Sequence, residues 1–192
     1  MTVKRQIITI LNSSETRRVR FSFTGEDGST VNVEPTMFRS VANAIENDQI
    51  AIVENWSTAD IAMYSARADP NNNVAANTLY LGRNQRSSRL FNALIVHEAV
   101  HAAWDIARHS LRWIDNEAAG YIAQAYYARN SGLPRTAYLY GSHAILAFSI
   151  VQGMRDSNDS DVSFFLSRLR ENLRNDPLYN TYINGQFDGD GV

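Results

Sequence analysis

The first third of the chain shows the alternation of apolar and polar residues that is typical of strands. Residues 18–24 carry an apolar side chain at every second position, which predicts a strand with one buried face. The turn-forming segment Gly-Glu-Asp-Gly follows at residues 25–28, and the alternation returns over residues 30–34. These features together predict a β-hairpin.

Further elements follow the hairpin. Pro35 marks a helix entrance, and apolar residues at helical spacing predict a helix over residues 36–47. A polar loop is expected at residues 69–73. Short strands are predicted on both sides of that loop, at residues 49–54, 59–66 and 77–82.

The second half of the chain has the pattern of helices. A long helix is expected to begin at Ser87 or Ser88, either of which can cap it, and to run to about His109. Three more helices are predicted, over residues 114–130, 136–154 and 162–173. We therefore expect a single α+β domain, with a hairpin region (residues 1–35), a core with a helical C-terminal half (36–175) and a loosely ordered tail (176–192).

The composition excludes several kinds of binding site. The 192 residues have a net charge of -2, which gives no excess of positive charge to bind nucleic acid. Arg83, Arg86 and Arg89 are interpreted as a solvated loop. The chain contains no cysteine, which excludes disulfides and thiolate metal sites. Any metal must therefore be held by His, Asp or Glu.

No segment resembles a leader or a membrane span. The apolar run at residues 6–11 is short and lacks a small-residue cleavage site. No window approaches the roughly 20 apolar residues that cross a bilayer. We expect a protein without membrane contact, either cytoplasmic or exported without a cleaved signal peptide. Lys4 is the only lysine, a depletion that resembles proteins delivered into a foreign cytosol.

The sequence His97-Glu98-Ala99-Val100-His101 carries the strongest chemical signal. Residues four apart lie on the same face of a helix, so two imidazoles can share one Zn²⁺. Glu98 lies one step around the helix, where its carboxylate can take a proton from a water at the metal. The neighbouring residues are apolar on nearly every side, and a metal would offset the cost of burying these ionisable groups.

The stretch from residue 90 to 125 resembles the active-site helices of zincin metallopeptidases. The resemblance implies that His97 and His101 are zinc ligands and that Glu98 is the general base. The metzincin pattern is excluded because Trp104 and Ala107 stand where it needs glycine and histidine. The gluzincin-like pattern instead takes a glutamate from the next helix.

Glu117 fits that third position. The small residues at 118–120 would let the two helices approach closely. Asp115 is a competing ligand, as in aspartate-using zincins, or a helix cap, and His109 is a third candidate. Asp105 is expected to orient an imidazole of a ligand.

Substrate contacts are less defined by the sequence. The strand at residues 77–82 precedes the motif and is expected to be an edge strand that holds an extended peptide by β-augmentation. A hydrolytic site also needs a donor for the tetrahedral oxyanion, for which Tyr121 and His143 are candidates.

The sequence therefore predicts a minimal zincin-like domain, with a small mixed sheet packed on the motif helix. We expect one Zn²⁺ per chain and hydrolysis of peptide or protein substrates of narrow range. Two alternatives are an inactive zincin-like module that serves as an interaction or sensor domain, and a delivered protease effector. The substrate and the oligomeric state stay open.

Overall fold

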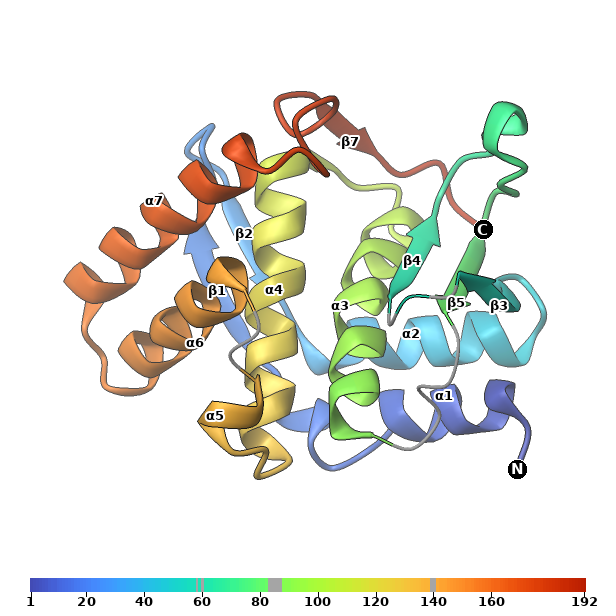
Figure 1. Ribbon diagram of the computed structural model, residues 1–192, viewed down its shortest axis with the longest axis horizontal. Coiled ribbons are helices and arrows are strands. Elements are labelled where there is room, and N and C mark those ends of the chain that lie inside the picture. Colours follow the sequence, from blue (N-terminus) through green and yellow to red (C-terminus); the bar gives the residue numbers. More distant parts are fainter. Residues whose placement is uncertain (58, 60, 83–87, 139–140) are drawn as a thin grey trace.

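Two long helices form the centre of the fold, which is α+β. The computed structural model describes residues 1–57, 59, 61–82, 88–138 and 141–192. The central helices are α3 (Arg89–Ile106) and α4 (Trp113–Asn130), which lie side by side (Figure 1). The other helices are α1 (Val3–Leu11), α2 (Pro35–Glu46), α5 (Arg135–Tyr138), α6 (Ser142–Arg155) and α7 (Asp159–Asn175).

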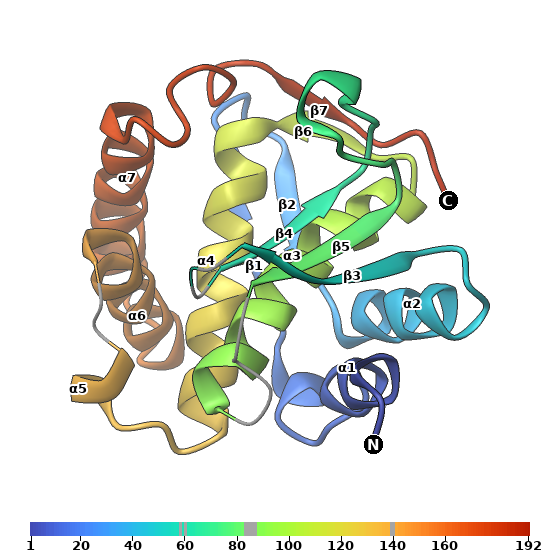
Figure 2. The same cartoon turned by 45° about the vertical axis from the view of Figure 1, so that its right-hand side comes forward.

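The remaining helices cover the two sides of the central pair. Helices α1 and α2 pack against α3, whereas α6 and α7 pack against α4 (Figure 2). Both central helices are consequently buried around most of their circumference, as the apolar surroundings of the motif predicted. Among the described residues, none of the helices has the length and apolar character that crossing a membrane requires.

The ends of α3 follow from local chemistry. Ser88 caps the helix, its side chain accepting a hydrogen bond from the backbone N–H of Phe91 at 3.0 Å. The other predicted cap, Ser87, lies outside the described residues, as do Arg83 and Arg86. The helix ends before His109 because Arg108 adopts a φ of 51°, which α-helical hydrogen bonding does not allow.

Within the described residues, three small sheets complete the fold. The predicted hairpin is confirmed as β1 (Phe21–Thr24) paired antiparallel with β2 (Thr30–Val33). A mixed sheet has the order β3-β5-β4, in which β3 (Ala51–Ser57) runs parallel and β4 (Ala62–Ser65) antiparallel to β5 (Thr78–Gly82). The third sheet pairs β6 (Ser110–Arg112) with β7 (Gln186–Asp188).

The prediction that residues 77–82 form an edge strand is wrong. This segment is β5, the central strand of the mixed sheet. Leu79, Tyr80 and Leu81 are all buried, which fits a strand covered on both faces. The strand that contacts α3 is β4, and it lies at an edge.

The N-terminal helix α1 was not predicted. The apolar run at residues 6–11 belongs to this helix, whose buried residues recur at helical spacing, at positions 3, 7, 10 and 11. Thr2 caps the helix through a bond from the backbone N–H of Arg5. Helix α1 therefore packs on α2 and α3 through one apolar face.

The helix predicted over residues 136–154 is interrupted. It is divided into α5 and α6, and Gly141 between them has a φ of 94°, outside helical geometry. Residues 139–140 lie outside the described residues. The last predicted helix is confirmed as α7, which begins earlier because the Asn158 side chain caps it.

The C-terminal strap, which we define as residues 176–192, is packed rather than loose. Its three glycines suggested a mobile end, but Tyr179, Ile183 and Phe187 are buried at every fourth position. The strap crosses over the N-terminal end of α4, where the Trp113 N–H donates to the Gly185 carbonyl (Figure 1). Its strand β7 then pairs with β6.

Asp105, near the end of α3, anchors this strap. Its fully buried carboxylate accepts hydrogen bonds from the backbone N–H groups of Asp190 (2.9 Å) and Gly191 (3.3 Å). It also accepts a bond from the Tyr64 hydroxyl on β4, at 2.6 Å. One carboxylate thus ties α3, the edge strand and the strap together.

Replacing this anchor should destabilise the fold. Asp105→Ala leaves three donors without their acceptor, so we expect the free energy of unfolding to fall by about 2–3 kcal/mol. Glu171→Ala is the control, because it removes an exposed ion pair with Arg168 and should cost less than about 0.5 kcal/mol. Urea unfolding measures both, and equal losses would contradict the anchoring role.

Candidate metal centre

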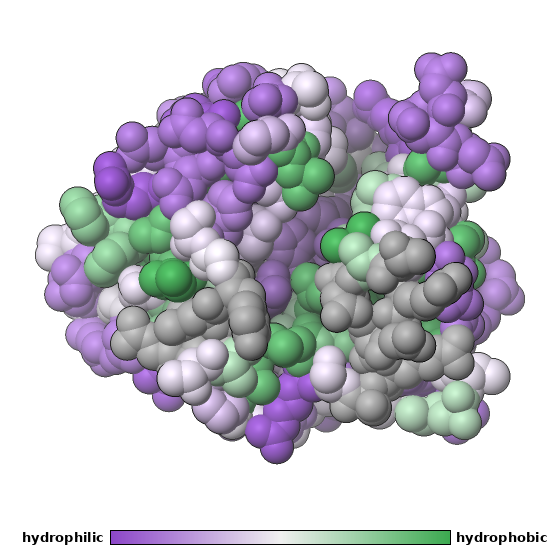
Figure 3. Space-filling view, in the orientation of Figure 1, coloured by the Kyte–Doolittle hydropathy of each residue, from purple (hydrophilic) through white to green (hydrophobic). Residues whose placement is uncertain are grey.

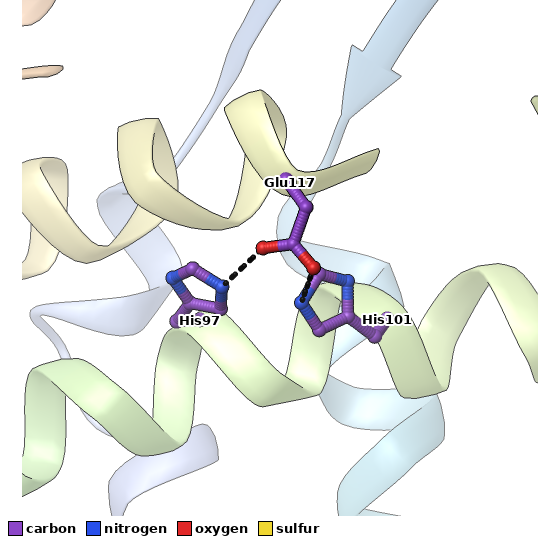
Figure 4. A group of neighbouring side chains, drawn as sticks. All are labelled: His97, His101 and Glu117. Atoms are coloured by element: carbon purple, nitrogen blue, oxygen red, sulfur yellow. Dashed lines mark ion pairs between the residues drawn. The ribbon is translucent and has the colours of Figure 1, made fainter. Parts of the chain in front are cut away.

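Two imidazoles and a carboxylate meet between α3 and α4. His97 and His101 lie one turn apart on α3, and Glu117 reaches them from α4 (Figure 4). The Nε2 atom of His97 lies 3.5 Å from Oε2 of Glu117, and Nε2 of His101 lies 3.8 Å from Oε1. The three donor atoms all lie within 4.8 Å of one another, a grouping that could hold a metal ion.

The donor types and their separations are compatible with a bound metal ion. In a tetrahedral site with bonds of about 2.0–2.1 Å, neighbouring donor atoms are about 3.3 Å apart. The two histidine–glutamate separations, 3.5 and 3.8 Å, exceed this by a few tenths of an ångström, and all three donor atoms lie within 4.8 Å of one another. The three residues are only 5%, 6% and 5% exposed, so a bound cation would compensate the buried carboxylate.

Two amide side chains on α4 orient the imidazoles. Nδ1 of His97 contacts Oε1 of Gln124 at 3.1 Å, and Nδ1 of His101 contacts Oδ1 of Asn116 at 2.8 Å. An amide oxygen only accepts hydrogen bonds, so in this arrangement each Nδ1 carries the proton. The other ring nitrogen of each imidazole, Nε2, is the atom that faces Glu117.

Sequence reasoning missed these two residues and assigned their role to Asp105. That assignment is wrong, because Asp105 binds the C-terminal strap and Tyr64. A signal was present: Asn116 and Gln124 are polar residues on the buried α4, placed beside Glu117 and two turns after it.

Gly120 makes room for His97. A Cβ atom at this position would lie 2.6 Å from Nε2 of His97, well inside van der Waals contact. Glycine in a helix interior is unfavourable by about 0.5–1 kcal/mol relative to alanine. The close approach of α4 to the imidazole explains why this position needs glycine.

Glu98 lies beside the group, held by the edge strand. Its side chain is 7% exposed, and Oε2 accepts a hydrogen bond from the backbone N–H of Tyr64 at 2.8 Å. Burial raises the pKa of Glu98 to about 7, even though the charge of His101 acts in the opposite direction. A carboxyl with this pKa can take up and release a proton near neutrality.

The pKa of Glu117 is shifted in the opposite direction. Burial raises this pKa, but the nearby imidazoles of His101 and His97 lower it by more, so that it lies below the ordinary value for a glutamate. The hydroxyl of Tyr182, on the C-terminal strap, donates to Oε1 of Glu117 at 3.3 Å. Burial and the charge of Glu117 raise the pKa of Tyr182, so the phenol stays a donor.

The competing ligands lie elsewhere. Asp115 bonds Nε of Arg170 at 3.0 Å and the backbone N–H of Glu26 at 2.9 Å. His109 is exposed and stacks on Trp104, with ring centroids 5.0 Å apart. Neither residue belongs to the group formed by the two motif histidines and Glu117.

The two candidate oxyanion donors, Tyr121 and His143, pack next to each other near His97. The Tyr121 ring lies edge-on to the His97 ring at 4.7 Å, and its hydroxyl bonds that of Tyr179 at 2.6 Å. The His143 ring packs against the Tyr121 ring, with centroids 5.1 Å apart, and its Nε2 lies 3.8 Å from Oδ2 of Asp176. Tyr182, which the sequence did not single out, is the hydroxyl that bonds a member of the group.

The surface is hollowed in front of the two central helices. Figure 3 shows a depression between the α6–α7 side and the β3–β5 side, with hydrophilic residues at its floor. In Figure 1, α3 and α4 lie behind this region. Comparison of the chain with protein-family models, curated proteins and solved structures gives no significant match.

The prediction that Glu117 is the third metal ligand is tested by a matched pair of substitutions. Glu117→Gln removes the charge that faces both imidazoles, so the apparent Kd for zinc should rise by at least about 10–100-fold. Asp115→Asn, two residues away, should change it by less than about threefold, because Asp115 faces Arg170. Competition with a chromophoric chelator measures both. The reverse order would transfer the assignment to Asp115.

The need for glycine at position 120 is tested by a double-mutant cycle in the presence of a chelator. In the native background, Gly120→Ala should lower the free energy of unfolding by about 1–3 kcal/mol, because the methyl group meets His97. In the His97→Ala background the same change should raise it by up to about 1 kcal/mol, since alanine favours the helix. The same effect in both backgrounds would contradict the steric explanation.

Proposed function

We propose that this protein is a zinc-dependent hydrolase of peptide bonds. His97, His101 and Glu117 would hold one zinc ion per chain, and Glu98 would be the general base. The observation that carries the proposal is the convergence of both Nε2 atoms on the Glu117 carboxylate, with Glu98 held beside them. The resemblance of residues 90–125 to zincin helices supports the same reading.

Glu98 is suited to move the proton in this reaction. When bound, zinc supplies the Lewis acidity that lowers the pKa of a water molecule toward about 7 and polarises a carbonyl. The Tyr64 N–H fixes one oxygen of Glu98, which leaves the other to accept the proton of that water. The same carboxyl then donates the proton to the leaving amine, for which a pKa near 7 is favourable.

The edge strand β4 is the proposed support for an extended substrate. It pairs with β5 on one side, and no strand of the described residues pairs with its other edge. Tyr64 of this strand bonds Glu98, so a peptide added along β4 would pass next to the general base. This assignment moves the substrate-binding role from β5 to β4.

A metal-binding module without catalysis is the second candidate. The burial of all three donor residues favours it, because structural metal sites are closed whereas catalytic sites keep a position open to water or substrate. Both candidate functions require the metal, but only the hydrolase requires Glu98 as a general base.

Substitution of the general base separates them. Glu98→Gln should keep about one zinc per chain by elemental analysis but reduce hydrolysis by at least about 100-fold, because it removes the proton acceptor. The assays are cleavage of labelled casein and of a complex peptide mixture read by mass spectrometry. His97→Ala should lose the zinc, and Glu171→Gln, an exposed carboxylate, is the control.

The outcomes are distinct. Zinc in the native protein without hydrolysis in either assay favours the metal-binding module. Hydrolysis that survives Glu98→Gln contradicts the proposed mechanism. A native protein that takes up no zinc, even after zinc is added back, rules out both candidates.

A further inference from the structure

The C-terminal strap brings a hydroxyl to the proposed third ligand. Tyr182 reaches back from the strap, and its hydroxyl bonds Oε1 of Glu117 at 3.3 Å across 65 residues of sequence. The Tyr182 ring packs edge-on against Trp113 at the start of α4, with ring centroids 4.9 Å apart. Packing and hydrogen bonding therefore fix the hydroxyl relative to the first turns of α4.

Tyr182 gives Glu117 a hydrogen-bonding partner from outside the group, at Oε1, the oxygen that faces His101. Gln124 and Asn116 each bond one imidazole on the side away from the group. Glu117 has no such partner on α3 or α4 among the bonds of the described residues, and its donor comes from the strap. A buried carboxylate needs a donor to hold its orientation as well as a positive charge to offset its own.

We infer that Tyr182 is a positioning residue, whose hydroxyl holds the Glu117 carboxylate toward the two imidazoles for metal binding. This inference rests on the proposed metal site and extends it to a segment that contributes no ligand. It makes the strap part of the metal centre, and not only a cover over α4. The inference concerns metal binding and does not depend on hydrolysis.

The neighbouring Tyr179 is a matched control. It lies on the same strap and is buried, but its hydroxyl bonds the Tyr121 hydroxyl at 2.6 Å and not a member of the metal-binding group. Removing either hydroxyl as phenylalanine keeps the ring and its packing. A difference between the two variants therefore reports on the contact with Glu117.

The experiment compares the full-length native chain with Tyr182→Phe and Tyr179→Phe. The apparent Kd for zinc is measured by chelator competition, and the absorption spectrum is recorded after loading with Co²⁺. We expect Tyr182→Phe to raise the Kd by about 10-fold or more and to change the Co²⁺ spectrum. Tyr179→Phe should leave the spectrum native and the Kd within about threefold.

The results distinguish a failure of the positioning role of Tyr182 from a failure of the metal centre. Equal Kd values and equal spectra in the native chain and Tyr182→Phe overturn the positioning role alone. Equal weakening by both variants also overturns it, because it would report general packing of the strap. A native chain that binds neither zinc nor Co²⁺ overturns the metal centre itself. An inactive protein that binds zinc still passes the test, since hydrolysis is not measured.

Discussion

The close approach of α3 and α4 at Gly120 is the constraint on which the site and the surrounding fold depend. The absence of a side chain there lets His97 lie against the backbone of α4, so Glu117, one turn earlier, reaches both imidazoles. Burying these groups between two helices is costly unless their hydrogen bonds and charges are satisfied together. Helices α1, α2, α6 and α7 pack on either side of this pair, so the two histidines and Glu117 lie in the interior of the fold.

The sequence predicted what depends on local periodicity. The spacing of His97 and His101 places them on one face of a helix, and the apolar residues around them predict that this helix is buried. The hairpin and the central helices followed from the same kind of pattern. Glu117 could be preferred over Asp115 by resemblance, but the tertiary structure separates the two, because Glu117 faces both imidazoles and Asp115 bonds Arg170.

What the sequence could not predict depends on partners that are distant along the chain. Asp105 is visible as an acidic residue near the motif, but its partners include backbone N–H groups about 85 residues later. The bond from Tyr64 to Glu98 spans 34 residues and uses a backbone donor, for which no side-chain motif exists. The strap was expected to be loosely ordered because of its glycines, but several of its residues are buried and its strand β7 pairs with β6, about 75 residues earlier in the sequence.

The position of Tyr182 also has a consequence for the order in which the nascent chain assembles. The two imidazoles and Glu117 lie within 21 residues of one another, so they can meet as soon as α3 and α4 have left the ribosome. Tyr182 is synthesised 65 residues after Glu117, a delay of several seconds at about 5–20 residues per second. During that interval, a growing polypeptide would present the donor atoms without the hydroxyl that aligns the carboxylate. The three residues of the proposed metal site and the hydroxyl that bonds Glu117 are thus separated in time during the biosynthesis of the protein.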